Sequence, residues 1–237
     1  MKKAIIVGAT SGIGNELAKA LSKNGYIVGV TGRRLEKLEE LKNTSPDSFI
    51  ISSFDSTLDN NSQKLEELAN KLGGLDLLIL SSGTGDINEN LDFEIENRIN
   101  KLNVIAFTEI LTWTFNYFNK QKSGHLVAIS SIAGIRGSRF APAYNASKSY
   151  QINYLEGLRQ KANKISKNIH ITDIRPGFVD TNMAKGDGLF WVASKEKASK
   201  QIFNIIKKKK SIAYVSKRWL IIAIILRILP NWLYKKM

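Results

Sequence analysis

Short apolar runs alternate with longer helical patterns along this chain of 237 residues, and that alternation limits the possible folds most strongly. Runs such as Leu77-Leu-Ile-Leu80 are apolar at consecutive positions, which is typical of strands covered on both faces in a parallel sheet. Helices between parallel strands form right-handed crossovers and cover both faces of the sheet. The pattern therefore predicts an α/β fold with a doubly wound parallel sheet of about seven strands.

The predicted strands and helices alternate strictly. We expect strands at residues 3–7, 26–31, 49–53, 75–81, 124–131, 169–175 and 212–216. We expect helices at residues 13–24, 35–42, 61–72, 92–118, 143–164 and 195–208. Because α/β chains of this length commonly keep one core, residues 1–237 are predicted to form a single domain.

Cysteine is absent from the sequence, which excludes disulfides, thiolate catalysis and zinc-thiolate sites. The two histidines, His125 and His170, fall in predicted strands with no carboxylate cluster near them, so we expect no metal site. Only four apolar residues separate the N-terminal lysines from Gly8, too few for the core of a signal peptide. A cytoplasmic location is therefore expected.

The net charge of +14 is concentrated near the C-terminus. Residues 185–237 contain thirteen Lys or Arg against two acidic residues, which accounts for +11 of the total. This basic part has no nucleic-acid recognition motif and is apolar between its charges. A nucleic-acid-binding function is therefore not expected.

A glycine-rich turn, Val7-Gly-Ala-Thr-Ser-Gly-Ile-Gly14, follows the first predicted strand. Glycines in such a turn allow close approach of the backbone to a pyrophosphate, and the next helix N-terminus supplies amide donors. Any turn favours glycine, but the position between the first strand and first helix indicates dinucleotide binding in a Rossmann-type fold. The residues expected to hold the cofactor here are Gly8, Thr10, Ser11, Gly12, Ile13 and Gly14.

The end of the second predicted strand indicates which dinucleotide binds. An NAD site usually has an acidic residue there for the ribose 2′-hydroxyl, whereas this strand ends in Arg33 and Arg34. Guanidinium groups pair well with a 2′-phosphate, so we predict NADP(H), with Arg33 as the main ligand and Arg34 as its support. The alternative is that both arginines are solvated at the start of a helix.

Residues after the third and fourth predicted strands are candidates for contacts with the adenosine half. Asp55, followed by Ser56, either accepts a hydrogen bond from the adenine amino group or is a solvated turn residue. Ser82 and Gly83 are small enough to let the backbone lie near the adenine ribose. All four residues are predicted to belong to the cofactor site.

The segment Tyr144-Asn-Ala-Ser-Lys148, with Ser131 upstream, has the clearest chemistry. A phenol and an ammonium four residues apart share one face of a helix, so Lys148 is expected to lower the pKa of Tyr144 and to reach the nicotinamide ribose. Tyr144 then suits proton exchange with a carbonyl or alcohol whose oxygen Ser131 hydrogen-bonds. Taken singly, each residue also has a structural explanation: a cap, helix packing or a solvated charge.

The chain resembles the short-chain dehydrogenase/reductase family from residue 3 to about residue 210. The turn Gly8-x-x-x-Gly12-x-Gly14 matches the cofactor turn of that family, and Ser131 with Tyr144-x-x-x-Lys148 matches its active site. The arginine after the second strand looks like that of NADP-preferring members. The resemblance implies hydride transfer between NADP(H) and a carbonyl or secondary alcohol.

The same resemblance implies further roles. Asn103 is implied to complete a catalytic tetrad and to hold a water in a proton relay to Lys148. The helices at 92–118 and 143–164 correspond to the family's subunit interface, which implies a homo-oligomer. The segment 176–181 is implied to contact the nicotinamide and pyrophosphate through Pro176, Gly177, Val179 and Thr181. Val7 and Leu80-Ser-Ser-Gly83 depart from the family's usual residues near the cofactor.

The resemblance implies a substrate lid over the pocket, which we predict at residues 182–200. Its apolar and aromatic residues are Met183, Leu189, Phe190 and Trp191. They favour a hydrophobic or extended substrate, or a lid that packs on its own core. Arg136 and Arg139 are candidates for binding an anionic substrate group, or are surface charges.

Residues 217–237 form a basic, apolar C-terminal tail. Its uninterrupted apolar run, 219–226, has eight residues, whereas a membrane-spanning helix needs about 20. Basic residues flank the run, as in segments that lie in the interface of an anionic membrane. Either the tail binds the membrane surface, which favours a lipid-linked or otherwise hydrophobic substrate, or it packs over the pocket or a partner subunit.

Two other functions fit parts of the sequence. A non-catalytic NADP-binding regulatory or scaffold protein would keep the fold, but Tyr144 and Lys148 favour an enzyme. Sugar-nucleotide-modifying enzymes related to the family share the Tyr-x-x-x-Lys pair but usually need a larger substrate domain. The leading hypothesis is therefore an NADP(H)-dependent oxidoreductase.

Overall fold

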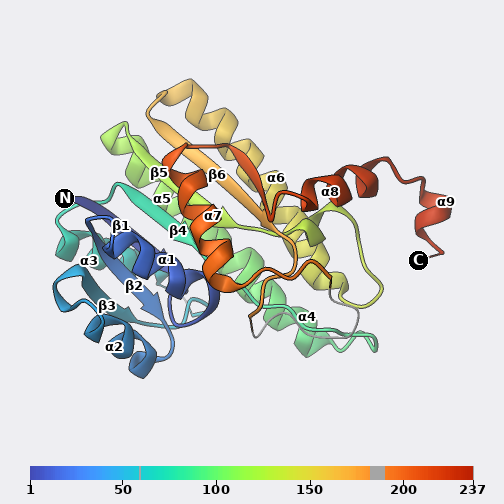
Figure 1. The fold of residues 1–237 in the computed structure, drawn as a ribbon, viewed down its shortest axis with the longest axis horizontal. Helices are drawn as coiled ribbons and strands as arrows, with labels where there is room; N and C mark the ends of the chain where they lie inside the picture. Colours follow the sequence, from blue (N-terminus) through green and yellow to red (C-terminus); the bar gives the residue numbers. More distant parts are fainter. Residues whose placement is uncertain (59, 182–189, 237) are drawn as a thin grey trace.

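The computed structural model describes residues 1–58, 60–181 and 190–236, and its centre is a sheet of seven parallel strands (Figure 1). The strands are β1 (Lys2–Val7), β2 (Tyr26–Gly32), β3 (Phe49–Ser53), β4 (Leu77–Leu80), β5 (Gly124–Ile129), β6 (Ile169–Pro176) and β7 (Ile212–Val215). Their order across the sheet is β3-β2-β1-β4-β5-β6-β7. The predicted doubly wound sheet in a single α/β domain is thereby confirmed.

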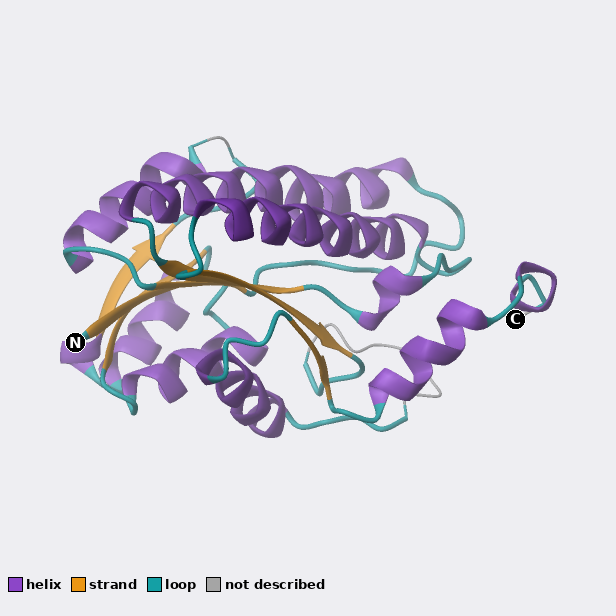
Figure 2. Ribbon diagram, turned by 90° about the horizontal axis from the view of Figure 1, so that it is seen from above, coloured by secondary structure: helices purple, strands orange, loops and turns teal. Residues whose placement is uncertain are grey.

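Helices cover both faces of the sheet (Figure 2). One face packs against α3 (Asn61–Leu72), α5 (Phe107–Gln121) and α6 (Pro142–Ile165), and the other against α1 (Gly12–Ser22), α2 (Leu35–Asn43) and α7 (Lys195–Lys207). Neighbouring residues of β1 alternate between these cores, since Ile5 belongs to the first and Ile6 to the second. Burial on both faces explains why the strands are apolar at consecutive positions.

The carboxyl ends of the central strands meet at one edge of the sheet. Val7 at the end of β1 is in register with Thr31 of β2 and with Leu80 of β4. The order of strands reverses between β1 and β4. In a doubly wound sheet, ligands bind in the crevice beside this reversal.

The helix predicted at residues 92–118 is interrupted. It consists of α4 (Phe93–Asn100), a π-helical turn (Lys101–Ala106) and α5. Such turns insert one extra residue into a helix and are frequent at functional sites. Asn103 lies in this turn and is fully buried.

The C-terminal tail forms two helices that the sequence analysis did not predict, α8 (Trp219–Ile228) and α9 (Asn231–Tyr234). They extend away from the sheet at the red end of the ribbon in Figure 1. Over the part of the chain that the structure describes, the helices are too short or too polar to cross a membrane. Of the lid predicted at 182–200, residues 182–189 lie outside the described residues, and those from Lys195 onward belong to α7.

Candidate active site

The turn after β1 depends on glycine. Gly8 and Gly12 have φ angles of 92° and 58°, in the left-handed region that favours glycine. A Cβ atom on Gly14 would lie 2.0 Å from the carbonyl oxygen of Gly8, so helix α1 can begin this close to the strand only with glycine there. The unpaired amides at the start of α1 suit an anionic group such as a phosphate.

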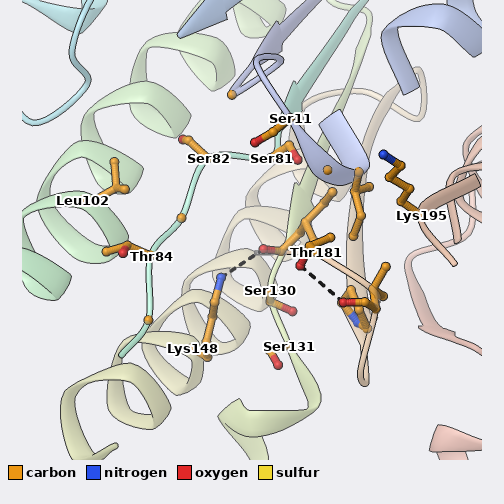
Figure 3. Close-up of a pocket in the computed structure, with 18 of the residues that line it drawn as sticks. Ser11, Ser81, Ser82, Thr84, Leu102, Ser130, Ser131, Lys148, Thr181 and Lys195 are labelled. Carbon is orange, nitrogen blue, oxygen red and sulfur yellow. Dashed lines mark hydrogen bonds between the residues drawn. The ribbon is translucent and has the colours of Figure 1, made fainter. Parts of the chain in front are cut away.

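A cavity of about 1360 Å³ lies at the carboxyl edge of the sheet. Figure 3 shows side chains from the glycine turn, the loop after β4 and helix α6 around it. The predicted site residues that line it are Gly8, Thr10, Ser11, Gly12, Ile13, Arg33, Arg34, Asp55, Ser56, Ser82, Gly83, Ser131, Tyr144, Lys148, Pro176, Gly177, Val179 and Thr181. Gly14 and Asn103 are buried outside this lining.

Arg33 and Arg34 both lie on the exposed rim of the cavity. The guanidinium of Arg34 donates to Thr10 Oγ1 at 2.8 Å and to Ser11 Oγ at 3.0 Å. Arg33 instead lies 3.4 Å from the carboxylate of Asp55. Arg34, predicted as the supporting residue, is therefore the one fixed beside the glycine turn.

Asp55 is anchored within its own turn. Its Oδ1 atom accepts hydrogen bonds from the amide of Thr57 at 2.9 Å and from the hydroxyl of Thr57 at 2.8 Å. Partial burial raises the pKa of the Asp55 carboxyl, but the bonds to Thr57 and the charge of Arg33 together lower it below its ordinary value. The turn accounts for these contacts, and the adenine contact stays a prediction.

Ser131 and Tyr144 meet at the far end of the cavity from the arginines. Strand β5 ends at Ile129, earlier than predicted, so Ser131 lies in the following loop. Its Oγ atom accepts a hydrogen bond from the amide of Ala133 at 3.1 Å and caps a 3-10 turn (Ile132–Ile135). The Ser131 side chain is also hydrogen-bonded to Tyr144. The structure thus brings the predicted pair together.

Burial dominates the proton affinity of both titratable groups. It raises the pKa of Tyr144, and the hydrogen bond with Ser131 opposes this only in part. Burial also lowers the pKa of Lys148 to about 8, while the charge of Asp173 acts in the opposite direction. Lys148 Nζ lies 5.8 Å from the centre of the Tyr144 ring. The sequence-based expectation of a lowered phenol pKa is therefore wrong, because desolvation raises the pKa of Tyr144 more than the hydrogen bond with Ser131 lowers it.

The buried ammonium of Lys148 is held by two acceptors. It donates to the carbonyl of Ile129 at 3.2 Å and to Oε1 of Gln151 at 3.0 Å. Nε2 of Gln151 donates to the carbonyl oxygen of Asn103 at 2.9 Å. An ammonium only donates and a carbonyl only accepts, so the two partners determine the orientation of the amide. The Gln151 side chain therefore links Lys148 directly to Asn103, where the resemblance implies a water.

The Asn103 side chain fixes the loop after β4. Its Oδ1 atom accepts from the amide of Thr84 at 3.0 Å, and its Nδ2 atom donates to the carbonyl of Thr84 at 2.7 Å. Nδ2 also donates to the hydroxyl of Ser147 on α6 at 3.0 Å. The π-helical turn is thus tied both to the cavity wall and to the helix that carries Tyr144.

A buried ion pair on β6 completes the surroundings of Lys148. The side chains of Asp173 and Arg175 are in contact at 2.7 Å and are nearly inaccessible to solvent. The hydroxyl of Ser130 donates to Asp173, and Arg175 donates to the hydroxyl of Tyr214 at 3.1 Å. Sequence analysis missed this pair and Gln151. Both carry a signal in the sequence, since polar residues fall at positions that the strand and helix patterns bury.

Helix α8 covers the loop that follows β6. A Cβ atom on Gly177 would lie 2.0 Å from the Trp219 ring, so the indole packs directly on the backbone of Gly177. A Cβ atom on Gly12 would lie 3.3 Å from the methyl group of Thr181. The predicted cofactor segment 176–181 therefore spans from the glycine turn to the tail.

The described end of the predicted lid packs on the tail. The Trp219 ring lies 5.3 Å from Phe178, 5.0 Å from Phe190 and 5.9 Å from Trp191, measured between ring centroids. Edge-to-face and tilted contacts at such distances are favourable for aromatic rings. The lid end, the loop after β6 and the tail thus form one aromatic cluster.

Arg136 joins the tail to the loop after Ser131. Its guanidinium donates to the carbonyl of Leu229 at 3.3 Å and to Oδ1 of Asn231 at 2.9 Å. It also lies 4.4 Å from the centre of the Tyr234 ring. These contacts account for Arg136 without an anionic substrate group.

Comparison with known proteins agrees with this arrangement. Residues 2–188 match the model of the short chain dehydrogenase family. An uncharacterized oxidoreductase of Myxococcus xanthus is 31% identical over 192 residues, covering 77% of this chain and 74% of the relative. A dehydrogenase/reductase SDR family protein 7-like of Dictyostelium discoideum is 31% identical over 193 residues, covering 76% and 60%. The chain therefore belongs to the short-chain dehydrogenase/reductase family.

Among solved structures, a short-chain type dehydrogenase/reductase from Mycobacterium ulcerans has a TM-score of 0.80 at 20% identity, over 91% of this chain and 88% of that chain. This similarity shows the fold. Members of the family are oxidoreductases that use NAD or NADP. The residues present fit such a cofactor, because the glycine turn and the start of α1 line one long cavity together with Tyr144 and Lys148.

Proposed function

We propose that this protein is an NADP(H)-dependent oxidoreductase that transfers hydride between the nicotinamide and a carbonyl or secondary alcohol. The observation that carries the proposal is that Ser131, Tyr144 and Lys148 share one cavity with the glycine turn. Burying the ammonium of Lys148 beside the partly buried Tyr144 costs free energy. A catalytic role explains that cost, whereas a purely cofactor-binding scaffold does not.

The bound cofactor supplies or accepts the hydride, and the protein handles the proton. In the reducing direction Tyr144 donates its proton to the substrate oxygen, and its raised pKa keeps the phenol protonated at neutral pH. Ser131 hydrogen-bonds the same oxygen and holds it at the phenol. The ammonium of Lys148 stabilises the phenolate left behind, which burial alone would penalise.

The catalytic assignment is tested with Tyr144→Phe, which removes only the hydroxyl. We expect kcat for reduction of an apolar ketone to fall by about 10²- to 10⁴-fold, because proton transfer contributes a factor of that order. Binding of NADPH, followed by fluorescence, should change little. Turnover of Tyr144→Phe at the wild-type rate would contradict the role of Tyr144 as proton donor. In the same assay, wild-type kcat in Ser131→Ala would contradict the role of Ser131 in holding the substrate oxygen.

NADP(H) is proposed over NAD(H) because Arg33 and Arg34 flank the end of β2 on the cavity rim. Guanidinium groups bind a phosphate through several donors, whereas the ribose 2′-hydroxyl gains little from them. The hydrogen bonds of Arg34 to Thr10 and Ser11 hold its guanidinium beside the glycine turn, which supports a role for Arg34 in binding the 2′-phosphate.

The cofactor preference is tested by comparing KM for NADPH and NADH in Arg33→Ala and Arg34→Ala. Each substitution should raise KM for NADPH by roughly ten- to a hundredfold, since charge-assisted hydrogen bonds contribute about 1.5–3 kcal/mol. KM for NADH should stay within a factor of about two, which makes it the internal control. An unchanged NADPH preference in both variants would contradict the assignment.

We also propose a homo-oligomer. Phe93 on α4 and Ile105 in the π-helical turn are 72% and 66% exposed, on the segment that the resemblance associates with subunit contacts. Large exposed apolar side chains favour an interface. Light scattering coupled to size-exclusion chromatography should give a mass above that of one chain, and a monomer at micromolar concentration would contradict this.

A further inference from the structure

We propose that α8 and α9 dock the protein on an anionic membrane surface, and that the pocket beneath α8 takes apolar carbonyl or alcohol substrates from that membrane. The choice of substrate rests on the proposed oxidoreductase function, whereas the docking does not. The inference follows from the two sides of α8, which are both apolar but have different surroundings.

The inner side of α8 forms part of the cavity wall. Trp219 and Ala223 are buried against the body of the protein. Trp219, Ile222 and Leu226 line the cavity together with Tyr144. On α8, positions 219, 222, 223 and 226 have the three- and four-residue spacing of a single helix face. The substrate end of the cavity is therefore walled by apolar side chains of the tail.

The outer side of α8 is just as apolar but has no partner among the described residues of the chain. Five large aliphatic side chains project from it, with Ile221 and Ile228 57% and 73% exposed. The other three are Leu220, Ile224 and Ile225. Trp232 and Leu233 of α9 add two further exposed apolar side chains. A helix that is apolar all round is normally buried, so the outer side requires a covering partner.

Charge favours a lipid surface as that partner. The tail carries five cations, and the sequence from 217 to 236 contains no acidic residue. The five cations are Lys217, Arg218, Arg227, Lys235 and Lys236. Basic residues around an apolar helix face are attracted to anionic headgroups while the apolar face enters the interface. In a two-fold contact with a second copy, the same face would bring ten cations together without an acidic side chain from either tail.

The two sides of α8 connect the membrane to the chemistry. The outer side and the pocket-lining side belong to the same helix, so they are separated by a single helix diameter of about 10–12 Å. It is held in place by the contacts of Arg136 with Leu229 and Asn231 and by Trp219 on Gly177. Docking through the outer side therefore places the apolar wall of the pocket at the lipid interface.

The docking is tested by flotation of the full-length protein with two kinds of vesicle, pure phosphatidylcholine and equimolar phosphatidylcholine and phosphatidylserine. We expect binding to the anionic vesicles that high salt weakens. Lys235→Gln with Lys236→Gln should weaken it by roughly thirtyfold, at about a factor of five for each lost cation. Ile221→Gln with Ile228→Gln should weaken it to a similar or greater extent, because both side chains enter the interface.

Leu58→Gln is the matched control, since Leu58 is 65% exposed in the loop after β3 and lies outside the tail and the cavity lining. This variant should float like the wild type. Absence of flotation on anionic vesicles, or equal flotation of the wild type and the two double variants, overturns the docking. A dimer that the Ile221 and Ile228 substitutions convert to monomer, without vesicle binding, assigns the face to a second copy and also overturns it.

The source of substrate is tested with two ketones, one short and water-soluble and one long-chain ketone carried in anionic vesicles. The double variant Ile221→Gln/Ile228→Gln should keep wild-type kcat/KM for the short ketone and lose at least about tenfold for the long one. Equal kcat/KM values of wild type and variant on the long ketone overturn delivery from the membrane. Failure of the wild type to reduce either ketone counts against the oxidoreductase proposal and leaves the flotation result standing.

Discussion

Gln151 is one of the two acceptors that hold the ammonium of Lys148. Gln151 is 1% exposed, accepts from Lys148 Nζ and donates to the backbone carbonyl of Asn103. A carboxamide, unlike a water molecule, does not readily pass a proton along a chain of hydrogen bonds. Because the ammonium is buried and Gln151 is one of its two acceptors, we expect the charge of Lys148 to respond to changes of this side chain.

Substitutions of Gln151 should move the pH dependence of kcat/KM in opposite directions. The Lys148 pKa of about 8 implies that activity requiring the ammonium falls as the pH rises through that value. Gln151→Leu removes an acceptor from the charged form and should move this decline to lower pH. Gln151→Glu places a carboxylate beside the ammonium and should move it to higher pH.

A role of Gln151 in packing alone would lower stability without moving the pH profile. Thermal unfolding of both variants is therefore measured alongside the kinetics, and a loss of about 1–3 kcal/mol is expected for Gln151→Leu from the unpaired carbonyl of Asn103. Two folded variants with the wild-type pH profile would show that Gln151 does not control the charge of Lys148.

The loop after β6 and helix α8 behave as one packed unit. The Trp219 indole lies against the backbone of Gly177, where even a methyl group has no room. Trp219 also joins the aromatic cluster with Phe178, Phe190 and Trp191. Displacement of α8 therefore disturbs the predicted cofactor segment and the described end of the lid together.

Gly177→Ala should release α8 from the body of the protein. The added Cβ atom would meet the Trp219 ring at 2.0 Å, and overpacking of this kind costs about 1–3 kcal/mol. Trypsin should then cleave after Lys217 or Arg218 faster than in the wild type. Gly157→Ala on α6 is the control, because nothing lies within 4 Å of its added Cβ atom. Equal cleavage rates for the two variants would argue against this packing.

The protein as a whole should lose stability in acid through His125, at the amino end of β5, on the opposite edge of the sheet from the site. Burial, followed by the charges of His170 and Lys209, lowers the pKa of His125 to about 3, and its Nε2 atom hydrogen-bonds Thr172 at 2.7 Å. The unfolded chain takes up a proton near pH 6.5, whereas the folded protein does not.

The His125 contribution is therefore fully present above about pH 6.5 and is lost as the pH falls toward 3, at up to about 1.4 kcal/mol per pH unit. Urea unfolding of the wild type and of His125→Gln between these pH values measures it. The variant should be less stable at pH 7 but lose less stability on acidification. Parallel pH dependence of the two proteins would rule out His125 as the cause.

The sequence alone determined the succession of strands and helices along the chain. It also determined those parts of the site whose residues are close together in the sequence. Burial on both faces leaves apolar runs in β4, and the glycine turn must adjoin a strand and a helix, so both are visible as patterns. Tyr144 and Lys148 are four residues apart on one helix, and that spacing fixes their shared face without any tertiary contact.

Only the tertiary structure decided the features that depend on contacts between distant segments. The fixed position of Arg34 depends on hydroxyls of the glycine turn, and the link from Lys148 through Gln151 depends on a π-helical turn hidden in a continuous helical pattern. The pKa of Tyr144 rises because desolvation by the surrounding fold outweighs the hydrogen bond with Ser131. The tail had two competing sequence interpretations. The structure packs one side of α8 on the pocket and leaves the other exposed, since a helix buries only the face for which the body offers a complementary surface.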